Sequence, residues 1–306
     1  MTTAEVKKAI AEKNLRTLGK LISAAENQEP SLYPILKDLY QDLGQAKVIG
    51  ITGAPGAGKS TLVNDYIRYI RENQKTVGVV AVDPISPFTG GALLGDRIRL
   101  TDHFNDPGVF IRSLSTRGKL GGLSLATRQV IHLLDAFLFS HILVETVGVG
   151  QSEVDVRNTA DLTIVVLVPE WGDSIQALKA GLLEIGDIFV VNKSDREGAP
   201  RVVAEIKNML QFSGKETTPV LLTEQNNRPL LDTLWKTVDG FYANDSQWKL
   251  HKRILNAKAE LLDLVQDYVL KEGRNWLGES VPKQGNPYSY FMDFLSRHPI
   301  GTLFGK

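Results

Sequence analysis

The sequence contains no cysteine among its 306 residues. Disulfide bonds, thiolate metal sites and cysteine nucleophiles are therefore excluded. Histidine is scarce as well, and its five copies are too scattered to form a metal-binding tract: His103, His132, His141, His251 and His298.

The sequence also lacks a charge excess, since 35 basic residues are balanced by 35 acidic ones. This balance gives no electrostatic reason to expect a nucleic acid or an anionic membrane as a partner. No apolar stretch reaches the roughly 18 residues of a spanning helix. The segment Met1–Lys20 lacks the basic-then-apolar pattern of a secretory signal. We therefore expect a cytoplasmic protein without nucleic-acid or membrane partners.

From Lys47 onward, short β-branched runs alternate with helical patterns. The expected strands are Val48–Thr52, Val77–Val82, Val109–Ile111, Ile142–Thr146, Leu162–Val168, Ile188–Asn192 and Val220–Thr223. The expected helices between them are Thr61–Arg71, Leu123–Leu138, Ile175–Leu183 and Val202–Phe212. This alternation predicts an α/β domain over 47–245, with a mostly parallel sheet covered by helices. Helical extensions are expected on either side, over 1–46 and 246–306.

A phosphate-binding loop is the strongest local signal. It follows an expected strand, opens a helix at Thr61, and consists of Gly53, Ala54, Pro55, Gly56, Ala57, Gly58, Lys59 and Ser60. Glycines let successive backbone N–H groups point at phosphate oxygens. Lys59 is placed to reach the β- and γ-phosphates, and the Ser60 hydroxyl to ligate Mg²⁺. The pattern predicts a P-loop nucleotide-binding fold.

The base is indicated by a second loop, which ends the expected strand at Ile188–Asn192. Asp195 can accept hydrogen bonds from the N1–H and the exocyclic amine of guanine. Adenine does not offer this pair of donors. The Lys193 stem can lie over the base, and Asn192 can tie this loop to the phosphate loop. We therefore expect GTP and GDP as ligands.

Acidic residues end several expected strands on the phosphate side. Mg²⁺ prefers hard oxygen ligands beside phosphate and water, so Asp83, Asp96 and Glu145 are candidate ligands together with Ser60. A helix cap or a solvated charge is the alternative for Asp83 and Asp96. In the glycine-rich segment that follows Glu145, Gln151 could orient water or could be an ordinary surface residue. We take Lys59, Glu145 and Gln151 as the catalytic candidates.

Four segments together resemble the MeaB/ArgK/MMAA group of P-loop GTPases. These segments are Ile51–Thr61, Val82–Arg99, Phe110–Ser113 and Val144–Glu153. The resemblance implies that Ser60, Asp83, Asp96 and Glu145 surround the magnesium. It also implies a homodimer built partly through C-terminal helices. The implied partner is an adenosylcobalamin-dependent acyl-CoA mutase, usually methylmalonyl-CoA mutase, which the GTPase serves as a chaperone by gating cofactor loading and protecting against inactivation.

The chain departs from this group at two places. Trp171 stands in a loop where the group has small residues, and Thr223-Glu-Gln-Asn replaces the usual Ser-Ala after the last strand. Two other functions remain open on the residues alone: a metal-insertion GTPase, which the missing cysteine disfavours, and a nucleotide-dependent scaffold that does not hydrolyse GTP. An apolar stripe within 246–272 requires a cover, which is either the chain's own nucleotide-binding domain or a second subunit.

Overall fold

The computed structural model describes residues 1–83, 100, 102–115, 125–146, 155–169, 181–244 and 246–280. A seven-stranded sheet forms its centre, with the order β3-β2-β4-β1-β5-β6-β7. Its strands are β1 (Lys47–Gly53), β2 (Val77–Asp83), β3 (Val109–Ser115), β4 (His141–Thr146), β5 (Leu162–Leu167), β6 (Ile188–Val191) and β7 (Val220–Leu222). Every recorded pair is parallel, which confirms the predicted α/β fold.

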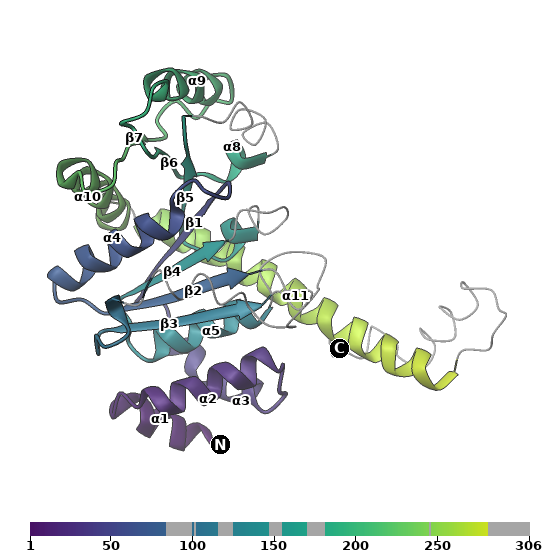
Figure 1. Cartoon of the computed structure of the whole chain (residues 1–306). Coiled ribbons are helices and arrows are strands. Elements are labelled where there is room, and N and C mark those ends of the chain that lie inside the picture. Colours follow the sequence, from purple (N-terminus) through teal and green to yellow (C-terminus); the bar gives the residue numbers. More distant parts are fainter. Residues whose placement is uncertain are drawn as a thin grey trace. The chain divides into compact units, whose positions relative to one another are not determined.

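Helices lie on both faces of the sheet (Figure 1), and a layer of apolar side chains is buried on each face. Successive side chains along a strand point to opposite faces, so Ile49 and Ile51 of β1 lie in one layer while Val48 lies in the other. One face is covered by α4 (Lys59–Glu72) and α10 (Arg228–Asn244). The opposite face is covered by α5 (Leu125–Ala136) and α9 (Ala199–Phe212). The short helices η3 (Val156–Asn158) and α8 (Leu183–Ile185) complete this part of the chain.

Helix α10 was missed by the sequence analysis. It buries Trp235, whose ring stacks on Tyr66 of α4 at a centroid distance of 4.0 Å. Leu231, Leu234 and Val238 line the same buried face at helical spacing. This spacing was present in the sequence and could have revealed the helix.

The N-terminal helices pack beside α5 (Figure 1). They are α1 (Thr3–Ala11), α2 (Leu15–Glu26), α3 (Leu32–Leu39) and the 3-10 turn η1 (Tyr40–Asp42). Thr2 and Glu5 form a capping box on α1, and the Asn14 side chain caps α2.

The linker from these helices to β1 is held by charged side chains. The Asp135 carboxylate of α5 accepts hydrogen bonds from the backbone N–H groups of Gln45 (3.2 Å) and Ala46 (2.9 Å). The Arg253 guanidinium donates to the Ala46 carbonyl at 2.9 Å and to both oxygens of Asp161 at 3.2 Å. Side chains of two helices therefore fix the start of β1, the strand that leads to the phosphate loop.

The last helix, α11 (Ser246–Ser280), begins within the compact unit Met1–Asn256, and a second unit comprises Ala257–Lys306. Up to Asn256, its inward side chains are Trp248, which packs with Phe241 and Tyr242 of α10 against the apolar core, and several polar residues. Lys252 pairs with Asp187 at 3.3 Å, Arg253 pairs with Asp161, and the Asn256 amide donates to the Ala160 carbonyl at 3.1 Å. No helix in the described ranges is long and apolar enough to cross a membrane.

Candidate functional site

The phosphate loop lies between the end of β1 and the start of α4. Gly53, Gly56 and Gly58 all have positive φ angles, of +136°, +75° and +89°. A Cβ on Gly53 would lie 2.1 Å from the Val166 carbonyl oxygen, and one on Gly58 would lie 2.3 Å from the Asn192 amide nitrogen. Glycine is therefore required at 53 for both conformation and space, whereas at 58 the backbone conformation favours glycine and a Cβ would displace the Asn192 amide. The backbone forms a cradle that suits phosphate oxygens.

Lys59 is the first residue of α4, and only 6% of it is exposed. Its ammonium group donates to the carbonyl oxygens of Gly53 at 2.6 Å and Ala54 at 2.9 Å. These bonds compensate the burial of the charge and hold it inside the loop. A positive charge is thus placed where the loop and the positive end of α4 both favour an anion.

The predicted neighbours Ser60 and Glu145 lie in direct contact. The Ser60 hydroxyl donates to the Glu145 carboxylate at 2.7 Å. Glu145 lies near the end of β4, directly beside Ile51 of β1, so strand pairing brings its side chain to the start of α4. A hydroxyl and a carboxylate are both hard oxygen ligands, so the pair fits Mg²⁺ bound to a nucleotide.

The other predicted magnesium and catalytic residues are only partly described. The backbone of Asp83 ends β2 beside the carboxyl end of β4, where Val82 pairs with Thr146. The Asp83 side chain, Asp96 and Gln151 lie outside the described residues, as do Trp171 and the rest of the glycine-rich segment that follows Glu145. Thr61 itself lies half-buried in α4. Among the side chains that the structure describes, no three acids or histidines cluster as a metal site.

The second predicted loop contacts the phosphate loop. The Asn192 amide donates to the Ala57 carbonyl at 2.9 Å, and the Lys193 ammonium donates to the Gly56 carbonyl at 2.9 Å. Lys193 has a positive φ of 57° as the chain leaves β6, and Asp195 follows on an exposed turn. The structure thus brings Asn192 and Lys193 against the loop, with Asp195 accessible to a base.

Two threonine contacts at this edge were not predicted. Buried Thr223 donates its hydroxyl proton to the Asn192 side-chain oxygen at 3.0 Å, and its carbonyl accepts from the Ser194 N–H at 3.0 Å. Thr223, at which the sequence departs from the MeaB/ArgK/MMAA group, therefore supports the loop that contains Asn192 and Ser194. The Thr146 hydroxyl donates to Thr52 at 2.9 Å and joins the ends of β4 and β1. In both cases the sequence offered one indication of such a contact, namely a threonine at the end of an apolar strand.

Known proteins match the chain over most of its length. The model of the family described as methylmalonyl-CoA mutase-associated GTPase MeaB matches residues 18–275. A Pyrococcus horikoshii protein classed as a GTPase is 45% identical over 92% of this chain and 88% of its own length. The mouse mitochondrial methylmalonic aciduria type A homolog is 33% identical over 73% of this chain and 56% of its own length. The crystal structure of an LAO/AO transport system kinase has a TM-score of 0.72 at 21% identity, covering 97% of this chain and 98% of that one.

Proposed function

Since the chain belongs to the MeaB family of methylmalonyl-CoA mutase-associated GTPases, and is therefore a GTPase that binds guanine nucleotide, we propose that its GTP turnover regulates an adenosylcobalamin-dependent acyl-CoA mutase. The carrying observation is the family match over residues 18–275. In this proposal the protein is a chaperone that gates cofactor loading and protects the mutase from inactivation. Methylmalonyl-CoA mutase is the proposed client.

The phosphate loop would hold the triphosphate of GTP. The backbone N–H groups of the cradle bind phosphate oxygens, and Lys59 exchanges its carbonyl partners for the β- and γ-phosphates. Ser60 and Glu145 would hold Mg²⁺ together with Asp83 and Asp96, and the bound ion would neutralise charge on the transferring phosphoryl group. Asp195 would bind the guanine edge, while Lys193 and Asn192 keep that loop against the phosphate loop. We assign the orientation of the attacking water to Gln151.

The client assignment is testable by co-elution. The purified full-length chain is mixed with methylmalonyl-CoA mutase from the same cell in GDP, in a non-hydrolysable GTP analogue or without nucleotide. Gel filtration should show a complex whose amount differs between the nucleotide states. Failure to co-elute in any state would remove this mutase as the client while leaving the GTPase assignment in place.

We further propose that residues 246–306 form a dimerisation arm outside the 47–245 GTPase domain and the 1–46 extension. The stripe Leu250, Ile254, Ala257, Leu261, Leu264 and Tyr268 alternates four- and three-residue steps, the spacing of a coiled-coil seam. Leu250 is 61% exposed, and Ile254 is 47% exposed. Apart from Trp248, which packs on the apolar core, the inward side chains of the same helix up to Asn256 are polar. The apolar stripe therefore needs a cover, and a second copy of the chain supplies a matching one.

Light scattering tests the arm. Glutamate at both 254 and 261 (Ile254→Glu with Leu261→Glu) should convert the dimer to a monomer, because each charge would be buried in the seam. Gln266→Glu is the matched control, since Gln266 is exposed and lies off the stripe. A dimer that survives the double substitution would contradict the arm.

A further inference from the structure

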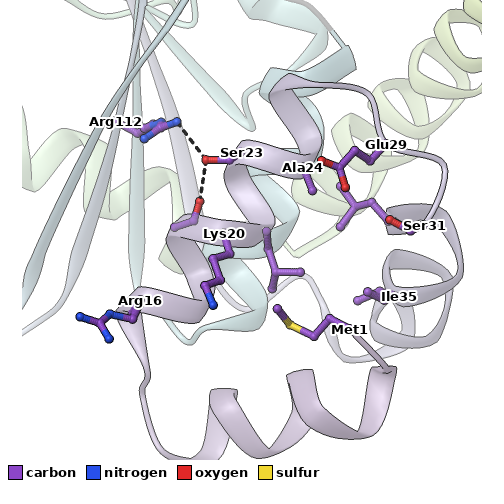
Figure 2. A pocket seen from close by; sticks show the side chains of 12 residues that line it. Met1, Arg16, Lys20, Ser23, Ala24, Glu29, Ser31, Ile35 and Arg112 are labelled. Carbon is purple, nitrogen blue, oxygen red and sulfur yellow. Dashed lines mark hydrogen bonds between the residues drawn. The ribbon is translucent and has the colours of Figure 1, made fainter.

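A pocket of about 540 Å³ lies among the N-terminal helices α2 and α3 and the strand β3 (Figure 2). This volume falls within the roughly 300–1,000 Å³ of small-molecule sites. The buried side chains Leu21, Leu32 and Ile35 give it an apolar part. All of its lining residues belong to the compact unit Met1–Asn256, and none belongs to the nucleotide site.

One wall of the pocket is cationic. Arg16 and Lys20 lie one turn apart on α2, and Arg112 reaches toward the same helix from β3 (Figure 2). Within the described part of the chain, neither Arg16 nor Lys20 makes a hydrogen bond or an ion pair. Arg112 pairs with Glu26 and lies 3.5 Å from the Ser23 hydroxyl, but its buried Nε makes no hydrogen bond. This Nε is not accessible from the pocket, so a ligand would contact other atoms of the Arg112 side chain.

The opposite rim carries Glu29 and Ser31 (Figure 2). Ser31 precedes the first residue of α3, yet its side chain makes no capping hydrogen bond. Its hydroxyl is thus available as a donor. Glu26 and Glu29 offset two of the three cationic side chains, so the pocket keeps a positive charge.

Gly19 of α2 lines the pocket. It lies in the middle of α2, where glycine costs stability relative to alanine. A Cβ at this position would meet no atom within 4 Å, so neither packing nor backbone conformation requires glycine. The backbone here is tied by a bond of 3.1 Å from the Ser23 hydroxyl to the Gly19 carbonyl. What the missing side chain does preserve is space in the pocket, which Gly19 lines.

We propose that this pocket binds a small organic anion, a carboxylate or phosphate monoester carried on a short apolar group. The anionic head lies against Lys20, Arg16 and the accessible part of the Arg112 side chain. The apolar group lies along the backbone at Gly19 and against Leu21, Leu32 and Ile35. The pocket is thus a second ligand site, apart from the phosphate loop.

Binding is measured by proton–nitrogen NMR on the full chain saturated with GDP, so that the nucleotide site is filled. The probes are butyrate and butyl phosphate, which separate the two sources of the anionic head, with butylammonium as the cationic control. At least one anion should bind saturably and shift α2 and α3 resonances, while butylammonium should not. Lack of saturable binding by both anions, or tighter binding of butylammonium, would overturn the proposal.

Two substitutions separate a binding role from a structural one. Gly19→Leu should raise the midpoint of thermal unfolding, because leucine favours a helix more than glycine does. It should still weaken binding of the anion about tenfold or more, because the leucine side chain fills the pocket. Lys20→Glu should weaken it similarly by reversing the charge, whereas Lys7→Glu, on an exposed lysine of α1 outside the pocket, should not. Unchanged affinity in both pocket variants would refute the site.

Discussion

The Ser60 hydroxyl donates to the Glu145 carboxylate at 2.7 Å, and this bond joins the first turn of α4 to the end of β4. This hydroxyl–carboxylate bond therefore holds the phosphate loop and the acidic end of the strand in one geometry. Glu145→Gln keeps the shape but removes the charge. We expect hydrolysis to fall about 10- to 100-fold, because weaker support of the metal costs this much, while GTP affinity changes less than about tenfold.

Magnesium-dependent turnover and calorimetric GTP binding, measured on the same preparation, check this expectation. Lys59→Ala serves as the contrast, since it should impair both binding and turnover. Wild-type turnover in the Glu145 variant would remove this residue from the site.

The base preference is predicted to depend on Asp195. Asp195→Asn should weaken GTP binding about 10- to 100-fold, because the amide cannot form the charge-assisted hydrogen bonds that the carboxylate makes to the guanine edge. The same variant should gain affinity for XTP, since xanthine has a carbonyl where guanine has its amine and an amide can donate to it. Calorimetric titrations with GTP, XTP and ATP measure all three. Equal affinity of the wild type for ATP and GTP would show that the base is not read here.

Two glycines of the phosphate loop form a matched pair for stability. Gly53→Ala places a Cβ 2.1 Å from the Val166 carbonyl, which is fixed backbone, in addition to the strain of its positive φ. Gly56→Ala carries a positive φ of 75° but meets no atom within 4 Å. We expect a loss of at least about 2 kcal/mol for Gly53→Ala and of about 1 kcal/mol for Gly56→Ala. Urea unfolding measures the free energy of unfolding of the two variants. An equal loss of stability in both would mean that the structure relieves the clash at position 53 at no cost.

A pH dependence of stability is expected from His141 at the start of β4. Burial, and then the nearby Lys47 charge, lower the pKa of His141 from 6.5 to about 4. Below pH 6.5, His141 is therefore protonated in the unfolded chain, whereas in the folded chain it stays neutral down to about pH 4. Stability is complete above pH 6.5 and falls as the pH drops through this window, by about 3 kcal/mol in total.

Denaturant titrations at pH 8, 6.5, 5.5 and 4.5 follow this loss. His141→Gln removes the titrating group, so the fall in stability between pH 6.5 and pH 4.5 should become smaller in that variant. The same fall in wild type and variant would assign the pH dependence to other groups.

The strands were predictable because each is a short apolar run, and their shared carboxyl edge placed Lys59, Ser60, Glu145 and Asn192 near one another. Contacts between distant segments were not predictable. Thr223 lies far from Asn192 in sequence, and its role depends on the pairing of β6 with β7. Helix α10 was missed because it follows the last strand of the sheet. The expected alternation of strands and helices ended there, so no helix was expected after it. The inward polar contacts of α11 were not predictable either, since Arg253 pairs with Asp161, a residue far away in the sequence that directly precedes β5.

GTP turnover with and without methylmalonyl-CoA mutase from the same cell tests the central claim most directly. The account predicts that added mutase changes the steady-state hydrolysis rate of the wild-type chain and leaves the Lys59→Ala variant inactive in both conditions. An unchanged wild-type rate at saturating mutase, with no complex in any nucleotide state, would contradict the claim that this GTPase serves the mutase.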